Sequence, residues 1–375
     1  MINSKARTWA EIDLNALENN FYAIKNIIPK GCKYLGVVKA DAYGHGAVQV
    51  AKRLEKIGAD YLAVAVIDEA IELRKAGIEL PIIILGYTSV EYIDLLIDND
   101  ITQTLTCEEM AVEYSNACIE KNKSVKVHLS IDTGMSRIGI LCNKENFELG
   151  IQSVFRICKL DNLEIEGIFT HFAVSDVSGE ENQLYTENQY EQFIKVIDKC
   201  HREGFDFKIK HCANTGATIN YTNYSLDMVR PGLSLYGYGD EKNELGLMPV
   251  MSLYTKINTI KEYGPGIHIS YGRRFKTEKN TRIGVVGIGY ADGLHRRMSN
   301  NCSFYSEAGF CQQRGSICMD MCMIDITDKK DIVKNSVIEI FGKHSDLNIL
   351  AEKAETITYE LLCSVSKRIP RVYKG

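Results

Sequence analysis

The sequence predicts an α/β fold in which a (β/α)₈ barrel is followed by a mostly β domain. Between residues 8 and 240, short β-rich apolar runs alternate with stretches whose apolar residues recur at helical spacing. The runs number eight, which suits a parallel sheet that closes into a TIM-like barrel. After about residue 240 the helical stretches largely vanish. We therefore predict a barrel domain at residues 1–240 and a β domain at residues 241–375.

The predicted barrel strands are residues 34–38, 61–66, 81–85, 101–105, 125–131, 163–169, 207–211 and 228–236. Amphipathic stretches between them, such as 14–24 and 67–77, are predicted helices, and Gly77 is the expected end of the second. A doubly wound open sheet is the competing arrangement, because periodicity alone does not separate the two. The count of eight favours the barrel.

The β domain is predicted to begin after a charged segment at residues 240–244. Residues 252–260 and 283–288 alternate like strands, and Gly-containing segments at 264–266 and 308–309 read as turns.

Polar residues follow several of the predicted barrel strands, and in such a barrel the chemistry lies at the carboxyl ends of the strands. These residues are Lys39, Asp132, His171, Asn214 and Arg230. Lys39 follows a buried apolar run and precedes a turn of small and polar residues. A lysine at such a strand end can place its amine in a cavity. A lysine that only reaches the surface is the plainer interpretation of that position.

Composition excludes several functional classes. The net charge of −5 and the lack of a basic block argue against a nucleic-acid partner. The first residues lack the apolar core of a signal peptide, and no apolar run approaches the roughly 18 residues of a membrane span. Twelve scattered cysteines without a C-x-x-C pair make a metal site unexpected and indicate reduced thiols. We therefore expect a cytoplasmic protein that binds neither membrane nor metal.

One segment resembles a known family. Residues 37–46, VVKADAYGHG, are similar to the cofactor-lysine signature of alanine racemases, which use pyridoxal 5'-phosphate (PLP). The resemblance implies that Lys39 binds PLP and that Tyr43 hydrogen-bonds its phosphate. It also implies a mostly β second domain, joined by the strand near residues 8–12.

Racemisation requires an acid–base group on each face of the substrate α-carbon. Residues 268–272, HISYG, match the family element whose tyrosine is the second base. The resemblance implies that Tyr271 takes the proton from the L-isomer and Lys39 takes it from the D-isomer.

Two further matches concern the cofactor ring. Residues 228–237, MVRPGLSLYG, match the element whose arginine, here Arg230, faces the ring nitrogen. A guanidinium has no acceptor, so it would hydrogen-bond an unprotonated nitrogen rather than protonate it. His171 matches the histidine that links this arginine to the catalytic tyrosine.

The resemblance also supplies phosphate-binding and substrate-binding residues. The residues expected at the cofactor are Tyr43, Asn214, Thr215, Tyr359 and the backbone N–H groups of Gly232 and Leu233. Family members usually carry serine where this chain has Thr215, so the hydroxyl is retained. Those expected at the substrate are Arg137, Tyr290, Met319 and Asp320.

In the family, the catalytic tyrosine and the Cys-Met-Asp element reach the barrel of the other subunit. The resemblance therefore implies a homodimer with composite active sites. At Ser130 this chain departs from many members, which carry a carbamylated lysine there. We expect a bound anion such as chloride, or a neutral hydrogen-bonding substitute, beside Arg137.

The leading hypothesis is an alanine racemase that supplies D-alanine for cell-wall peptidoglycan. A serine or broad-spectrum racemase of the same fold is the alternative, but Tyr359 is typical of alanine-specific members. A PLP carrier without catalysis would lack the residues after 240, and a decarboxylase of related fold would place an acid at Arg230.

Overall fold

The computed structural model describes residues 6–240 and 243–375. The chain folds into two compact units. One, the barrel unit, consists of residues 18–42 and 47–247; the other, the β unit, consists of the chain up to Leu17, residues 43–46 and the chain from Met248 onward.

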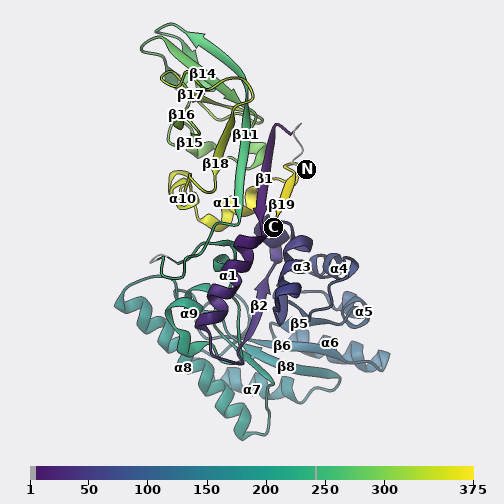
Figure 1. Ribbon diagram of the computed structural model, residues 1–375. Helices are drawn as coiled ribbons and strands as arrows, with labels where there is room; N and C mark the ends of the chain where they lie inside the picture. The colour runs from purple at the N-terminus through teal and green to yellow at the C-terminus, as the bar shows by residue number, and fades with distance from the viewer. Residues whose placement is uncertain (1–5, 241–242) are drawn as a thin grey trace. The chain divides into compact units, whose positions relative to one another are not determined.

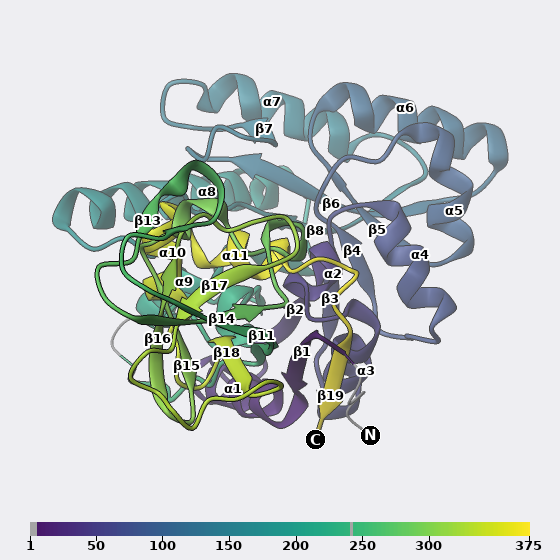
Figure 2. The same ribbon diagram turned by 90° about the horizontal axis from the view of Figure 1, so that it is seen from above.

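Eight parallel strands form the barrel unit, which confirms the predicted barrel (Figures 1 and 2). In sheet order they are β10 (Met228–Val229), β2 (Lys33–Val37), β3 (Tyr61–Val64), β4 (Ile82–Ile84), β5 (Ile101–Leu105), β6 (Val125–Asp132), β8 (Leu163–Phe169) and β9 (Ile209–His211). The Asp227 N–H donates to the Lys210 carbonyl (3.0 Å) and the Arg230 N–H to the Ala213 carbonyl (2.9 Å), which joins the first strand to the last. A short strand, β7 (Ile140–Leu141), pairs with β6.

Helices cover the outer side of the strands (Figure 2). They are α1 (Leu14–Ile27), α3 (Ala47–Ile57), α4 (Ile67–Lys75), α5 (Ile93–Asp98), α6 (Glu108–Lys121), α7 (Phe147–Cys158), α8 (Glu180–Arg202) and α9 (Thr215–Asn220). The apolar spacing explains their packing: α3 buries Ala47, Val50, Ala51 and Leu54. Helix α4 ends at Lys75 with Ala76 as its C-cap, and Gly77, the predicted end, follows one residue later with a φ of 84°.

The last predicted strand, residues 228–236, is wrong in extent. Only Met228–Val229 is a strand, and residues Leu233–Tyr236 form a 3₁₀ turn, η3. Pro231 has no N–H for a sheet ladder, so the apolar run that follows it leaves the sheet.

Antiparallel strands dominate the β unit (Figure 1). The sheet order is β14 (Thr281–Val286), β17 (Cys322–Asp325), β16 (Gly309–Arg314), β15 (Ser303–Ser306), β18 (Val337–Phe341), β11 (Met251–Tyr263), β1 (Thr8–Asp13) and β19 (Arg371–Lys374). A further pairing of β14 with β11 closes six of these strands into a ring. Strand β1 pairs antiparallel with β11 and parallel with β19.

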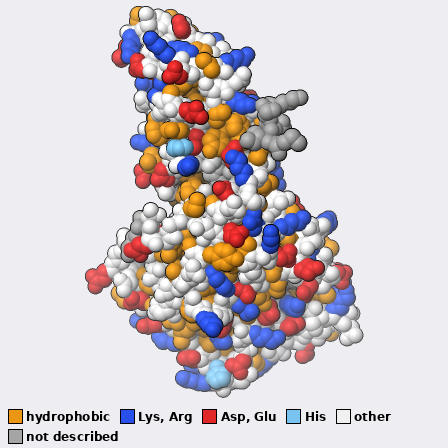
Figure 3. All heavy atoms as spheres, in the orientation of Figure 1, with side chains coloured by type: hydrophobic (Ala, Val, Ile, Leu, Met, Phe, Trp, Pro, Cys, Tyr) orange, Lys and Arg blue, Asp and Glu red, His pale blue; other side chains and the backbone are white. Residues whose placement is uncertain are grey.

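The remaining elements of the β unit are short. They are the hairpin strands β12 (His268–Ile269) and β13 (Phe275–Lys276), the helices α10 (Leu347–Ala354) and α11 (Thr358–Ser364), and the 3₁₀ turns η4 (Tyr271–Arg273), η5 (Tyr290–Asp292) and η6 (Arg296–Met298). None of the helices in the described ranges combines the length and apolar character that crossing a membrane requires. On the face shown in Figure 3, acidic and basic side chains are intermixed.

Candidate active site

A left-handed turn follows Lys39 at the carboxyl end of β2. Residues 40–43 all have φ of 52–53°, although none of them is glycine. For L-amino acids this conformation costs roughly 1–2 kcal/mol per residue. A run of four such residues therefore persists only because neighbouring groups hold it, as is common at functional sites.

Two carboxylates hold the turn. The N–H of Ala40 donates to Oε1 of Glu69 (2.6 Å), whose other oxygen accepts the N–H of Ala65 (2.8 Å). The carboxylate of Asp41 accepts the N–H of Ala47, the first residue of α3 (2.7 Å). The turn is thus tied to α3 and to α4, which carries Glu69.

Arg230 lies beyond β10 and is 4% exposed. Its NH2 group donates to the carbonyls of Thr170 (2.8 Å) and Cys212 (3.1 Å) and contacts Nδ1 of His171 (3.3 Å), while its NH1 group contacts Nδ1 of His211 (2.9 Å). Burial lowers the pKa of Arg230 to about 10. Within the described ranges no carboxylate forms an ion pair with this guanidinium, which is unusual for a buried cation.

The charges of three cations act on His171. The pKa of His171 lies well below its ordinary value, first because protein encloses the ring and then because of the charges of Arg230, Arg137 and Lys39. These residues follow three different strands, β10, β6 and β2. The structure therefore places Arg230 in contact with a neutral His171 (3.3 Å), and the charges of Lys39 and Arg137 act on the same ring.

The predicted phosphate loop is internally bonded. The Gly232 N–H donates to Oγ1 of Thr215 (2.9 Å), and Ser234 Oγ lies 3.5 Å from the same atom. Asn214 uses its side-chain oxygen to cap α9 through the Ala217 N–H (3.0 Å). Thr215, Gly232 and Leu233 are thus close neighbours, whereas Asn214 positions the helix that begins at Thr215.

Ser130 is buried in β6, and Arg137 is exposed in the segment after that strand. A Cβ at Gly139 would lie 2.9 Å from Oγ of Ser130, so the chain passes close to this serine. The expected anion beside Arg137 stays a prediction.

The β unit contains the remaining predicted residues. The rings of Tyr43 and Tyr359 lie 5.6 Å apart, and burial, followed by the nearby Tyr359 and Cys363, raises the pKa of Tyr43. Tyr271 is 73% exposed, Met319 53% and Tyr290 43%. The β unit therefore presents three predicted site residues outward.

Hydrogen bonds place these exposed residues on adjacent segments. Ser316 Oγ donates to the Tyr271 carbonyl (2.8 Å), and the Tyr290 N–H donates to the Cys318 carbonyl (3.0 Å). The Ala291 N–H donates to the Met319 carbonyl (3.0 Å).

A buried carboxylate that sequence reasoning missed supports these segments. Asp292 is fully buried and accepts from Arg7 (3.0 Å), Arg368 (2.7 Å) and the Gly289 N–H (3.0 Å). Arg368 also donates to the carboxylate of Asp320 (2.8 Å), and Arg7 to its carbonyl (2.7 Å). The cluster, which we call the Asp292 clamp, thus fixes the loops of Tyr290 and Met319 to each other.

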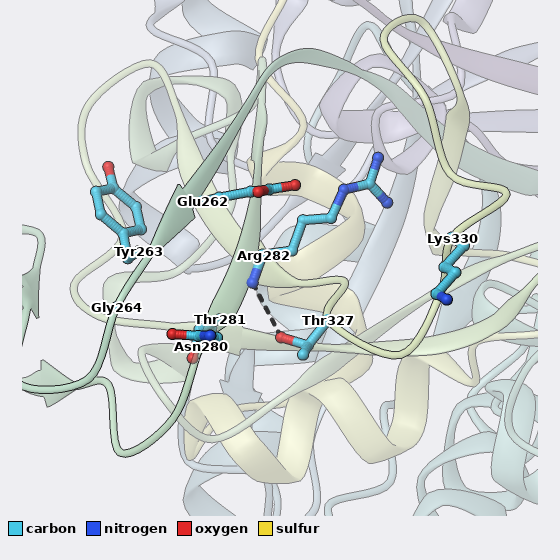
Figure 4. Close-up of a pocket in the computed structure, with 8 residues that line it drawn as sticks. All are labelled: Glu262, Tyr263, Gly264, Asn280, Thr281, Arg282, Thr327 and Lys330. Carbon is cyan, nitrogen blue, oxygen red and sulfur yellow. Dashed lines mark hydrogen bonds between the residues drawn. The ribbon is translucent and has the colours of Figure 1, made fainter.

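A cavity of about 630 Å³ also lies on the β unit, at the ends of β11 and β14 (Figure 4). None of the predicted site residues lines it. The Arg282 guanidinium at its wall donates to the carbonyls of Lys329 (3.1 Å) and Ile332 (2.8 Å), so it supports a loop. Within the described ranges, no group of three His, Cys, Asp or Glu side chains is placed to hold a metal ion.

Comparisons with known proteins cover nearly the whole chain. Residues 12–240 match the family described as the alanine racemase N-terminal domain, and residues 250–373 match the alanine racemase C-terminal domain. An alanine racemase from Clostridium tetani is 43% identical over 97% of this chain and 95% of its own length. A solved alanine racemase from Clostridium difficile 630 superposes with a TM-score of 0.90 at 40% identity, covering 99% of this chain and 96% of that chain. One from Bartonella henselae with covalently bound pyridoxal phosphate has a TM-score of 0.87 at 27% identity, covering 98% of this chain and 100% of that chain.

Proposed function

Because this chain belongs to the alanine racemase family, we propose that it is a PLP-dependent isomerase that interconverts L- and D-alanine. The observation that carries the proposal is the placement of Lys39 and Arg230. They follow β2 and β10, which are neighbours in the sheet, and both act on the pKa of His171. An amine and a buried guanidinium thus lie at the carboxyl end of one barrel.

When bound, PLP withdraws electrons from the α-carbon of an amino acid, so that its proton becomes removable. The residues of the barrel unit fit this group. Lys39 would hold its aldehyde, Thr215 with the N–H groups beyond Pro231 would hold its phosphate, and Arg230 would face its ring nitrogen. Arg230 has only donors and pairs with no carboxylate within the described ranges, so it suits an acceptor nitrogen.

We propose that Lys39 and Tyr271 exchange the α-proton from opposite faces of the substrate. Tyr271, Met319 and Tyr290 are exposed on the β unit, which supports a role against a second copy of the chain. Each active site of this homodimer would then contain Lys39 of one copy and Tyr271 of the other. Arg137 and the Met319 N–H would bind the substrate carboxylate.

A complementation experiment tests both the pair of proton-exchanging residues and the composite active site. Lys39→Ala and Tyr271→Phe, each inactive alone, are unfolded, mixed and refolded together. In a twofold dimer with composite sites, half of the dimers are mixed and one of their two sites has both groups, so about a quarter of the wild-type activity returns. A mixture that stays inactive, with dimers confirmed by light scattering, contradicts the composite site. An inactive wild type loaded with PLP contradicts the proposed reaction.

We also propose alanine as the preferred substrate and peptidoglycan as the use of D-alanine, in the cytoplasm. Tyr359 beside Tyr43 supports the preference, because a phenol there leaves less room for a substrate hydroxyl. Assays with L-alanine and L-serine test it, and equal turnover of the two contradicts it.

A further inference from the structure

A line of buried polar groups runs from Arg230 through the barrel. Nδ1 of His211 lies 2.9 Å from Arg230, and Nε2 of His211 lies 2.9 Å from Nδ1 of His128. Oε2 of Glu166 lies 3.5 Å from Nε2 of His128. His128 and His211 are fully buried, and the Glu166 side chain is 17% exposed. The line joins four strands or strand ends: β10, β9, β6 and β8.

Arg230 fixes the direction of every hydrogen bond in this line. A guanidinium only donates, so Nδ1 of His211 must accept and its proton must lie on Nε2. That proton is donated to Nδ1 of His128, so the proton of His128 lies on its own Nε2. This N–H faces the carboxylate of Glu166, and within the described ranges no group forms a well-aligned hydrogen bond with Nε2 of His128.

The charges agree with this order. Burial lowers the pKa of His211 and of His128, and the charge of Arg230 lowers each pKa further. The contact with Glu166 raises the pKa of His128, but burial outweighs it and the pKa stays below its ordinary value, so both rings are neutral. The contact with His128 lowers the pKa of Glu166, which is therefore ionised. The line thus has a cation at one end, a carboxylate at the other, and two aligned neutral imidazoles between them.

The backbone is shaped to allow this contact. Val127 on β6 pairs with Ile165 on β8, whereas the next residue, His128, pairs with Gly167, so Glu166 is an extra residue in a β-bulge. Bulges redirect side chains and are frequent beside active sites. A Cβ at Gly167 would lie 2.5–2.8 Å from three atoms of the His128 ring, so the ring occupies space that glycine leaves free.

We propose that Glu166 is the counter-charge of Arg230, relayed through His128 and His211, and that these three are positioning residues for Arg230 at the cofactor ring. The part that concerns the cofactor rests on the proposed function. The relay itself does not, because its geometry lies within the barrel unit and requires no ligand.

Nitrogen-15 NMR of the protein with labelled histidine tests the relay without a mutation. We expect neutral Nε2–H tautomers for His128 and His211, assigned with His128→Asn and His211→Asn. An Nδ1–H tautomer or a doubly protonated ring at either position overturns the proposal. Activity plays no part in this measurement, so its failure is distinct from that of the proposed reaction.

Charge removal gives a second test. Glu166→Gln keeps the shape but loses the charge. Glu164→Gln is the matched control, since Glu164 lies on the same strand and forms an ion pair with the exposed Lys208 at 3.9 Å. We expect Glu166→Gln to shift both histidine signals and to lower kcat by about tenfold with little change in KM, the scale found for outer partners of metal-bound histidines. The control should do neither. In the His128→Asn background the effect of Glu166→Gln should vanish, whereas additive losses would overturn the relay.

Discussion

Replacement of Ala40 by glycine should stabilise the protein, although glycine normally weakens ordered structure. Ala40 is exposed and has a φ of 52°, and its N–H bond to Glu69 does not depend on its side chain. Relief of the left-handed conformation is worth about 1–2 kcal/mol. The greater freedom of glycine in the unfolded chain offsets about 0.5–1 kcal/mol of this. The expected gain is about 0.5–1 kcal/mol in the free energy of unfolding.

Urea unfolding of the wild type and of Ala40→Gly, followed by circular dichroism, measures this gain. Ala117→Gly is the matched control, because Ala117 lies inside the right-handed helix α6. The control should lose about 0.5–1 kcal/mol, so the same chemical change has opposite signs at the two positions. A loss at Ala40 equal to the loss at Ala117 would refute the left-handed turn and the strain assigned to it.

The remaining predictions concern the clamp, the bulge and one ion pair. Asp292→Asn should lower the free energy of unfolding in urea by about 1–3 kcal/mol, because two arginines lose their buried charged partner. Asp320→Asn should lower it by less than about 1 kcal/mol. Equal losses for the two variants would contradict the Asp292 clamp. Gly167→Ala should lower the free energy of unfolding by about 1–3 kcal/mol, because its Cβ meets the His128 ring. Gly264→Ala, whose Cβ meets one atom at 3.9 Å, should leave the stability nearly unchanged. Equal unfolding midpoints for the two variants would contradict the close packing at Gly167. Hydrogen bonds from Arg156 and Ser153 lower the pKa of Glu108 to about 2, so its stabilisation is present above the ordinary carboxyl pKa and is lost as the pH falls toward 2. The stability difference between the wild type and Glu108→Gln should therefore stay below about 1 kcal/mol at pH 6 and shrink on acidification; a difference that grows in acid would contradict the assignment.

The fold class was predictable because its signal is local and repeated. Strand runs such as 61–66 and 81–85 are apolar on both faces, as parallel strands buried on both sides must be. The end of the sheet was less predictable, because residues 233–236 are as apolar as a strand and only Pro231 indicates that the sheet has ended.

Site residues were predictable only where they lie in a continuous sequence motif. Lys39 and Arg230 lie in such motifs, and the roles proposed for them stay predictions. Asp292, Arg7 and Arg368 are ordinary charged residues at distant positions, so only the folded chain brings them into one clamp. The left-handed turn was not predictable, because alanine and aspartate give no sign of the positive φ that they adopt.

The β unit is built from segments that are far apart in the sequence, and this has a consequence for its folding during synthesis. Its strand β1 is synthesised before the barrel strands, but its partners β11 and β19 are synthesised after the whole barrel unit. During translation the barrel sheet can close while β1 waits with both edges unpaired, and such edges are where nascent chains associate wrongly. Synthesis of β11 and β19, rather than barrel closure, should therefore set the moment at which β1 becomes resistant to proteolysis.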